Sequence, residues 1–169
     1  VDAVQFTCGE YPKVDPPTIS AEGVYDLSFT VGQTGGLNAN VDSITVAFPS
    51  QTTMPYNMAA GGIYVSTLPI TGSDCPPPLP AKPVTFPPTI SGSAVTFITP
   101  IPIGNGQTVY VKFCKSAGIK NPYTAGNYTL QVKTSSQPTY AVSCPYAIGT
   151  AISNVDVKVI PNAACNANA

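Results

Sequence analysis

Five cysteines and eight carboxylates are the side chains in this 169-residue sequence whose types could carry out chemistry, and no histidine accompanies them. Without an imidazole, Ser-His-Asp and Cys-His arrangements cannot form, and covalent haem attachment lacks its CxxCH motif. The carboxylates do not show the paired spacing that indicates glycoside hydrolysis. They are Asp2, Glu10, Asp15, Glu22, Asp26, Asp42, Asp74 and Asp156. We therefore expect no catalytic residue, no cofactor and no metal centre, and we interpret the chain as a protein that is not an enzyme.

The cysteines are Cys8, Cys75, Cys114, Cys144 and Cys165. Their spacing is not that of a zinc site and fits disulfides formed in an oxidising compartment. Cys144 is in phase with the apolar residues of its segment and is expected to face the core. Cys114 is out of phase with its neighbours, so a Cys114–Cys144 bridge is not the first choice. Cys8, Cys75 and Cys165 are candidates for pinning terminal segments and a loop. Because five is odd, we expect at most two disulfides per chain and one buried thiol.

Two weaker ligand expectations come from loops and from one sequon. Asp42, or the loop from Asp15 to Glu22, is a candidate for binding calcium through loop oxygens, although the sequence has no EF-hand-like loop. Asn127-Tyr128-Thr129 obeys the rule for N-glycosylation. The signal of the sequon is weak, since the same triplet also fits the alternation of a strand.

Charged residues make up only 9% of the chain, against roughly 25% in typical soluble domains. Such a surface lacks the charge that keeps monomers apart, which favours association with copies of itself or the attachment of glycans. The seven basic residues form no patch that would bind nucleic acid. No apolar run approaches the roughly 18 residues of a membrane span. Because the sequence begins with Val1 and not with Met, we expect an exported, extracellular protein from which a leader peptide was removed.

Alternation of apolar and polar residues predicts short strands throughout the chain and no helix. The clearest pair lies in Val109 to Thr134, where two alternating runs are joined by a turn-rich crossing that contains Gly118 and Asn121-Pro122. Other runs are expected at Val1–Thr7, Gly23–Val31, Ser43–Phe48, Ile63–Leu68, Ala94–Ile98, Thr139–Tyr146 and Ser153–Ile160. In the run Thr139–Tyr146, the alternating residues Tyr140, Val142, Cys144 and Tyr146 are expected to face the core. The fold class that follows is an all-β, Ig-like antiparallel sandwich with terminal strand extensions.

Two motifs in these runs resemble those of a known module. They are Ile44-Thr45-Val46-Ala47-Phe48-Pro49, of the form I-x-V-x-FP, and the GI-x-NP-x-x-AG-x-YTL-x-V-x-TS stretch that begins at Gly118. Together they resemble the Ig-like sandwich module of surface-layer, adhesin-type and secreted proteins of Gram-positive bacteria. The resemblance covers roughly Pro16 to Ile148 and implies a structural role at the cell surface without catalytic residues.

The resemblance implies a division of the chain into three parts. Residues 1–15 are expected to form an N-terminal strand or arm, and residues 16–148 the sandwich. Residues 149–169 are expected to form a C-terminal strand and tail. The sandwich contains a Pro-rich loop at 71–88 that is longer than the usual loop of the module, and its prolines favour an extended, polyproline II backbone.

Three classes of function remain: a subunit of an extracellular filament, an adhesin or glycan-binding module, and a spacer domain. Low charge and an extra apolar segment at each end favour the filament, in which head-to-tail copies of the chain would be joined by donor-strand complementation. The preferred donor is Val1, Val4 and Phe6, although the same segment also fits the first strand of the sandwich. The alternative donor is Val155, Val157 and Val159. Glycan binding ranks second, because the chain has no tryptophan for an exposed aromatic platform.

Overall fold

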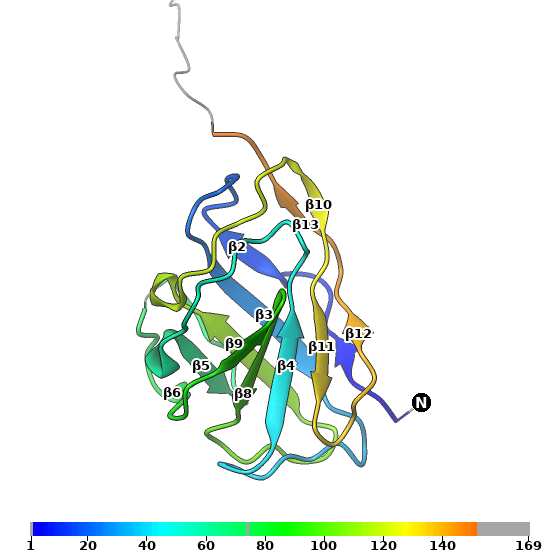
Figure 1. Cartoon of the computed structure of the whole chain (residues 1–169). Coiled ribbons are helices and arrows are strands. Elements are labelled where there is room, and N and C mark those ends of the chain that lie inside the picture. Colours follow the sequence, from blue (N-terminus) through cyan, green and yellow to red (C-terminus); the bar gives the residue numbers. More distant parts are fainter. Residues whose placement is uncertain (1, 74, 152–169) are drawn as a thin grey trace, which may run out of the picture.

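The computed structural model describes residues 2–73 and 75–151, which fold into two layers of antiparallel β-sheet (Figure 1). The predicted all-β, antiparallel sandwich is confirmed. Sheet I has the strand order β1-β3-β9-β5-β6, with β2 pairing along β3 beside β1. Its strands are β1 (Gln5–Phe6), β2 (Lys13–Asp15), β3 (Val24–Thr30), β5 (Ile63–Ser66), β6 (Lys82–Pro83) and β9 (Thr108–Phe113).

Sheet II has the order β12-β11-β4-β8-β7. Its strands are β4 (Ser43–Ala47), β7 (Thr89–Ser91), β8 (Ala94–Ile98), β11 (Gln131–Thr134) and β12 (Ala141–Val142). A separate ladder joins β10 (Gly126–Tyr128) to β13 (Tyr146–Ile148), and two single 3-10 turns, η1 (Ala60–Gly62) and η2 (Lys115–Ala117), lie in the connections.

The core lies between the two sheets and is built by the predicted alternation. Tyr25, Leu27 and Phe29 of β3 are fully buried, as expected for one face of a strand whose neighbours point the other way. Aromatic rings connect the layers: Phe113 packs edge-on against Phe48, with ring centroids 5.3 Å apart. Large aromatic side chains thus fill the centre of the sandwich.

Asn121 fixes the long crossing between β9 and β10 to sheet I. Its side chain is fully buried, and its Oδ1 accepts a 2.7 Å hydrogen bond from the Tyr25 hydroxyl. Its Nδ2 donates to the carbonyls of Pro16 and Thr18, each at 2.7 Å. The amide of Asn121 therefore ties the crossing to β3 and to the segment before it, about 100 residues away in sequence, and its oxygen and nitrogen both have partners.

The expected phase of the strand Thr139–Tyr146 is confirmed at Tyr146 and wrong before it. Val142 is 57% exposed, Tyr140 is also exposed and Cys144 is only half-buried, whereas Ser143 and Tyr146 are buried. Ser143 interrupts the strand: its N–H donates to the Leu130 carbonyl, and its hydroxyl accepts from the Leu130 N–H. Before Ser143 the chain pairs with β11 through β12, and after it the chain pairs with β10 through β13. The side chains that face the core therefore shift by one residue, as at a bulge.

Candidate assembly surface

The N-terminal segment lies in the chain's own sandwich. Val4 is buried in the core, and Phe6 packs on Phe29 with ring centroids 6.4 Å apart. β1 pairs with β3 through Gln5↔Thr30 and Phe6↔Phe29. Residues 1–15 were expected to be an arm or the first strand, and the structure gives the second arrangement for residues 2–15. Val1 lies outside the described residues. Val4 and Phe6 therefore fill their own core and do not project from it.

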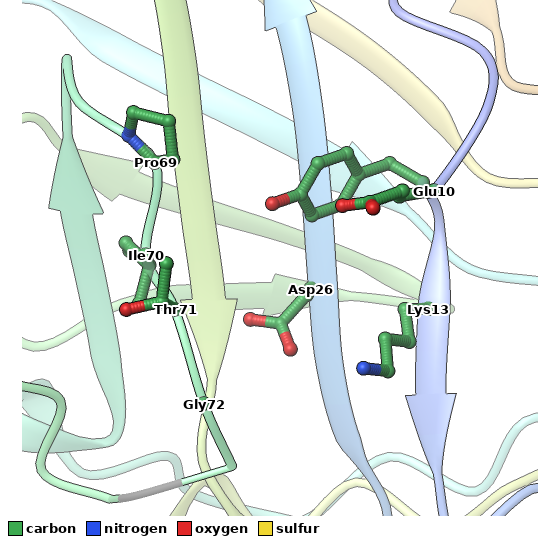
Figure 2. Close-up of a pocket in the computed structure, with 8 residues that line it drawn as sticks. Glu10, Lys13, Asp26, Pro69, Ile70, Thr71 and Gly72 are labelled. Atoms are coloured by element: carbon green, nitrogen blue, oxygen red, sulfur yellow. The ribbon is translucent and has the colours of Figure 1, made fainter.

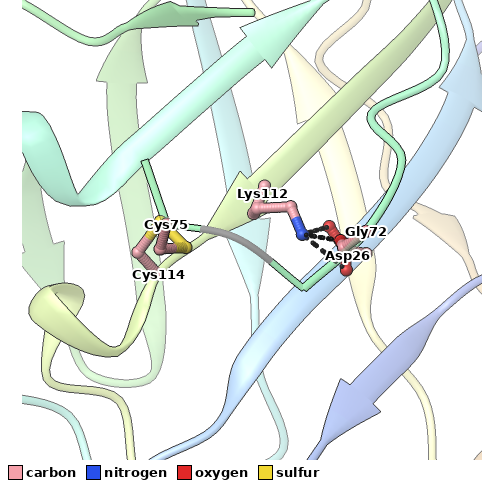
Figure 3. Close-up of a disulfide and its surroundings, with 5 residues drawn as sticks. All are labelled: Asp26, Gly72, Cys75, Lys112 and Cys114. Carbon is pink, nitrogen blue, oxygen red and sulfur yellow. Dashed lines mark hydrogen bonds and ion pairs between the residues drawn. A yellow bond between two sulfur atoms is a disulfide. The ribbon is translucent and has the colours of Figure 1, made fainter. Parts of the chain in front are cut away.

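Two disulfides hold the periphery of the sandwich. Cys8 is bonded to Cys144, which joins the end of β1 to the connection between β12 and β13. Cys75 is bonded to Cys114, which anchors the Pro-rich loop to the end of β9 (Figure 3). Cys8 and Cys75 pin a terminal segment and a loop, as expected. Cys114 is buried, although it is out of phase with the core-facing residues of β9. Cys165 lies outside the described residues. The disulfides fit an oxidising, extracellular compartment.

These pairings predict the thiol content of the denatured protein. Labelling in denaturant without reductant should detect one thiol per chain, and labelling after reduction should detect five, because four of the five cysteines are consumed by the two bonds. Mass spectrometry of the labelled peptides identifies the residue. No labelled thiol, together with a covalent dimer on a non-reducing gel, would contradict this prediction.

Most edges of the two sheets are blocked. Pro12 and Pro16 flank β2, and Pro83 lies within β6; proline lacks the N–H that a further strand would need. β12 contacts β1, so that side of the sandwich is closed. Beside β10, the Gln51 Oε1 accepts a 2.6 Å hydrogen bond from the Tyr128 hydroxyl. Natural sheets use such features to prevent unwanted pairing of edges.

β7 is an open edge in the described part of the chain. It pairs with β8 on one side only. Pro87 and Pro88 directly precede it, but no proline occurs from Thr89 to Ile98, so the backbone N–H groups of β7 itself are all present. The turn between them is Gly92-Ser93, with Gly92 at a φ of 60°, a value typical of a two-residue hairpin. The pair that flanks such a turn, Ser91 and Ala94, exchanges both backbone hydrogen bonds. In the next pair, Ile90 and Val95 do not bond each other, so the N–H and C=O of Ile90 point to the unpaired side of β7.

A row of apolar side chains crosses sheet II and ends at this edge. Val132 is paired with Val46, Val46 with Val95, and Val95 with Ile90. The three valines are fully buried, whereas Ile90 is only half-buried. At this edge the backbone hydrogen bonding of the sheet stops at β7, and the row of apolar side chains stops at Ile90. We refer to Thr89–Ser91 with its free side as the β7 edge. Strand β7 was not predicted from the sequence, although Gly92-Ser93 between two short alternating runs is a hairpin signal.

A second feature lies on the outer face of sheet I, where two segments cover β3 and β9. They leave a basin of about 440 Å³ (Figure 2). Its lining residues are Glu10, Tyr11, Lys13, Asp26 and the segment 69–72. Figure 2 shows the Asp26 carboxylate between Lys13 on one side and Thr71 on the other. The scattered carboxylates Glu10 and Asp26 thus come to line one basin.

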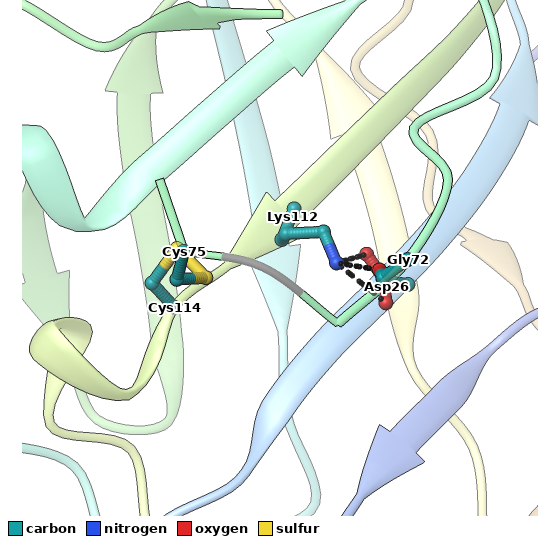
Figure 4. Close-up of polar contacts among 5 residues, drawn as sticks. All are labelled: Asp26, Gly72, Cys75, Lys112 and Cys114. Atoms are coloured by element: carbon teal, nitrogen blue, oxygen red, sulfur yellow. Dashed lines mark hydrogen bonds and ion pairs between the residues drawn. A yellow bond between two sulfur atoms is a disulfide. The ribbon is translucent and has the colours of Figure 1, made fainter. Parts of the chain in front are cut away.

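The Asp26 carboxylate at this basin is already bound to Lys112. The Lys112 ammonium is fully buried and lies 3.0 Å from Asp26 Oδ1, and it also donates to the Gly72 carbonyl at 2.9 Å (Figures 3 and 4). Burial raises the pKa of Asp26 above its ordinary value, and Lys112 opposes this rise. The pair is a cross-strand neighbour pair in β3 and β9. The sequence feature that could have indicated this ion pair is the position of Lys112 between Val111 and Phe113 in β9.

The calcium candidate Asp42 serves as a loop cap. Its carboxylate accepts hydrogen bonds from the Asn38 N–H at 2.7 Å and from the Ser135 hydroxyl at 2.9 Å, which lower its pKa. In the other candidate loop, Asp15 lies in β2 and Glu22 forms a backbone bridge with Lys120. In residues 2–73 and 75–151, no three His, Cys, Asp or Glu side chains are grouped as metal ligands. No helix in the same part of the chain is long and apolar enough to cross a membrane.

Comparisons with known proteins give a fold-level likeness only. No protein-family model matches the chain, and no curated protein matches it in sequence. Among solved structures it is similar to the N-terminal domain of the Streptococcus gordonii adhesin Sgo0707, with a TM-score of 0.44 and 10% identity over 82% of this chain. The chain spans 31% of the length of that structure.

Proposed function

We propose that this chain is the subunit of an extracellular filament in which the C-terminal segment of one copy adds to the β7 edge of the next. The observation that carries the proposal is the apolar row that ends at Ile90 with its backbone groups free. An added strand would continue both the ladder and the row, which is the recognition mode called β-strand addition.

The proposed donor is Ser153–Ile160, which lies outside the described residues. Its sequence alternates Val155, Val157 and Val159 with Asn154, Asp156 and Lys158. In an added strand, every second side chain faces the core, so the three valines would lie on the core side and one of them would lie beside Ile90. Full burial of a valine-sized side chain contributes about 1.5–3 kcal/mol. The donor preferred from the sequence, with Val4 and Phe6, packs in its own sandwich, which is why we propose the alternative donor.

The proposed donor and acceptor are different parts of the molecule, as a head-to-tail contact requires. Residues 149–151 leave the sandwich at the end opposite to that of the N-terminal residues (Figure 1). A donor that leaves one end and an acceptor elsewhere on the same molecule form a heterologous interface, which propagates into a fibre. The low charge of the chain provides little repulsion against this association.

The first test uses the two faces of the proposed donor. We expect Val157→Asp to reduce the polymerised fraction at least tenfold, because it would place a charge in the apolar row. Asp156→Ser, one residue away on the polar face, should polymerise like the unaltered chain. Pelleting and negative-stain electron microscopy measure both. Normal filaments from Val157→Asp would reject the C-terminal donor and return the role to Val4 and Phe6.

The second test concerns the acceptor. Ile90→Thr keeps a β-branched side chain but shortens the apolar row, so we expect weaker assembly with a nearly unchanged melting temperature. An equimolar mixture of the Val157→Asp and Ile90→Thr chains should form dimers in sedimentation, since only one donor and one acceptor remain intact. Filaments of unaltered length from Ile90→Thr alone would show that the β7 edge is not the acceptor.

A further inference from the structure

We infer that Asn127 is a site of covalent N-linked glycosylation. The inference is independent of filament assembly and rests on how β10 presents the sequon Asn127-Tyr128-Thr129 together with the surface beside it. This triplet is the only Asn-x-Ser/Thr sequence with x other than proline in the chain.

The strand presents both recognition residues of the sequon to solvent. Asn127 and Thr129 are exposed, and Tyr128 between them is half-buried, as the period of a strand requires. The Tyr128 ring lies 6.2 Å from that of Tyr146, and its hydroxyl is bonded to Gln51. Burial of Tyr128 therefore fixes the backbone, while the Asn127 amide and the Thr129 hydroxyl remain outside.

A basin of about 430 Å³ adjoins the sequon, and both Asn127 and Thr129 line it. Its other polar lining residues are Ser50, Gln51, Ser93 and Gln131. None of the residues that line this basin is charged. Hydroxyl and amide groups donate and accept neutral hydrogen bonds, as the hydroxyls of a saccharide do. The surface around Asn127 can thus accommodate the first sugar of a glycan without displacing a buried group.

The reaction requires a sugar that is activated as an ester of a phosphate or pyrophosphate, together with a glycosyltransferase. The Asn127 Nδ2 forms a bond to the anomeric carbon, and the bond from that carbon to the phosphate oxygen breaks. The amide proton that is lost leaves with the phosphate leaving group. A glycan at this position would add polar surface to a chain with few charges, which supports solubility.

Mass spectrometry of the protein isolated from its native source tests the inference. Trypsin should release the peptide Asn121–Lys133, because Lys120 and Lys133 bound it. We expect a saccharide mass on Asn127 and none on Asn121, which precedes proline and serves as an internal control. The measurement uses the denatured chain, so it gives the same answer whether or not the protein forms filaments.

Two variants expressed in the native source test whether glycosylation of Asn127 requires the sequon or only an exposed asparagine. Thr129→Ala should abolish the added mass, and Thr129→Ser should retain it, because the hydroxyl at this position is what the sequon requires. Recovery of Asn121–Lys133 mainly in unmodified form from the native protein would overturn the inference. Retention of the mass in Thr129→Ala would place the sugar on a different residue and overturn it equally.

Discussion

Replacing Lys112 with methionine is expected to destabilise the sandwich by about 3–5 kcal/mol. The substitution leaves the largely buried Asp26 carboxylate without the ammonium group with which it forms an ion pair. The Asp26 side chain is only 15% exposed, and the Lys112 side chain is fully buried. Urea denaturation at neutral pH measures the change in the free energy of unfolding. The double variant Lys112→Met/Asp26→Leu should recover most of the loss, since no charge is then left unpaired.

The destabilisation should also depend on pH. Burial already raises the pKa of Asp26 above the ordinary 3.8, and removal of Lys112 removes the main opposing effect. In the variant, the folded state therefore binds the Asp26 proton more tightly than the unfolded state does. Its stability is then greatest below the unfolded pKa and falls as pH rises through the folded pKa. We expect the difference between Lys112→Met and the unaltered chain to shrink on acidification from pH about 7 to about 3.5. A difference independent of pH would contradict this assignment.

Asn121→Leu is expected to destabilise the protein by about 3 kcal/mol, because it leaves the Tyr25 hydroxyl and the carbonyls of Pro16 and Thr18 without their partner. The leucine has a similar volume, so the loss reports on hydrogen bonds and not on a cavity. Tyr25→Phe, the matched control, removes the hydroxyl and should cost about 1–2 kcal/mol. The double variant should cost clearly less than the sum of the two, since both substitutions remove the same bond. Strict additivity would show that the bond contributes nothing to stability.

The sequence alone was sufficient for the central strands but not for the edges. The alternation in β3, β4 and β9 predicted their faces, because each strand has one side on the core. The two-residue and three-residue edge strands are too short for a periodic signal. In the Pro-rich loop, Lys82–Pro83 pairs with β5, which the prolines concealed.

The candidate site was predictable only in part. The alternation of Val155, Val157 and Val159 marked a possible donor, but the acceptor depends on which edges the folded sandwich covers. The pairings Cys8–Cys144 and Cys75–Cys114 span distant segments, and the phase of Cys144 was misjudged because the Ser143 interruption comes from tertiary contacts with Leu130. The Asp26–Lys112 pair was also missed, since it requires knowing that β3 and β9 are neighbours.

The Cys8–Cys144 bond has a mechanical consequence for the filament that we propose. Tension applied through the donor segment would enter each subunit at Ala151 and peel β13 from β10 one residue at a time. The unravelling would stop at Cys144, because its bond to Cys8 continues the load path into β1 and the central sheet. Only residues 145–151 lie beyond this bond in the described chain, so each subunit could lengthen by about 25 Å before the load reaches β1 and the central sheet. Single-filament stretching should therefore show a short, reversible extension per subunit in the oxidised protein and a much longer one after reduction.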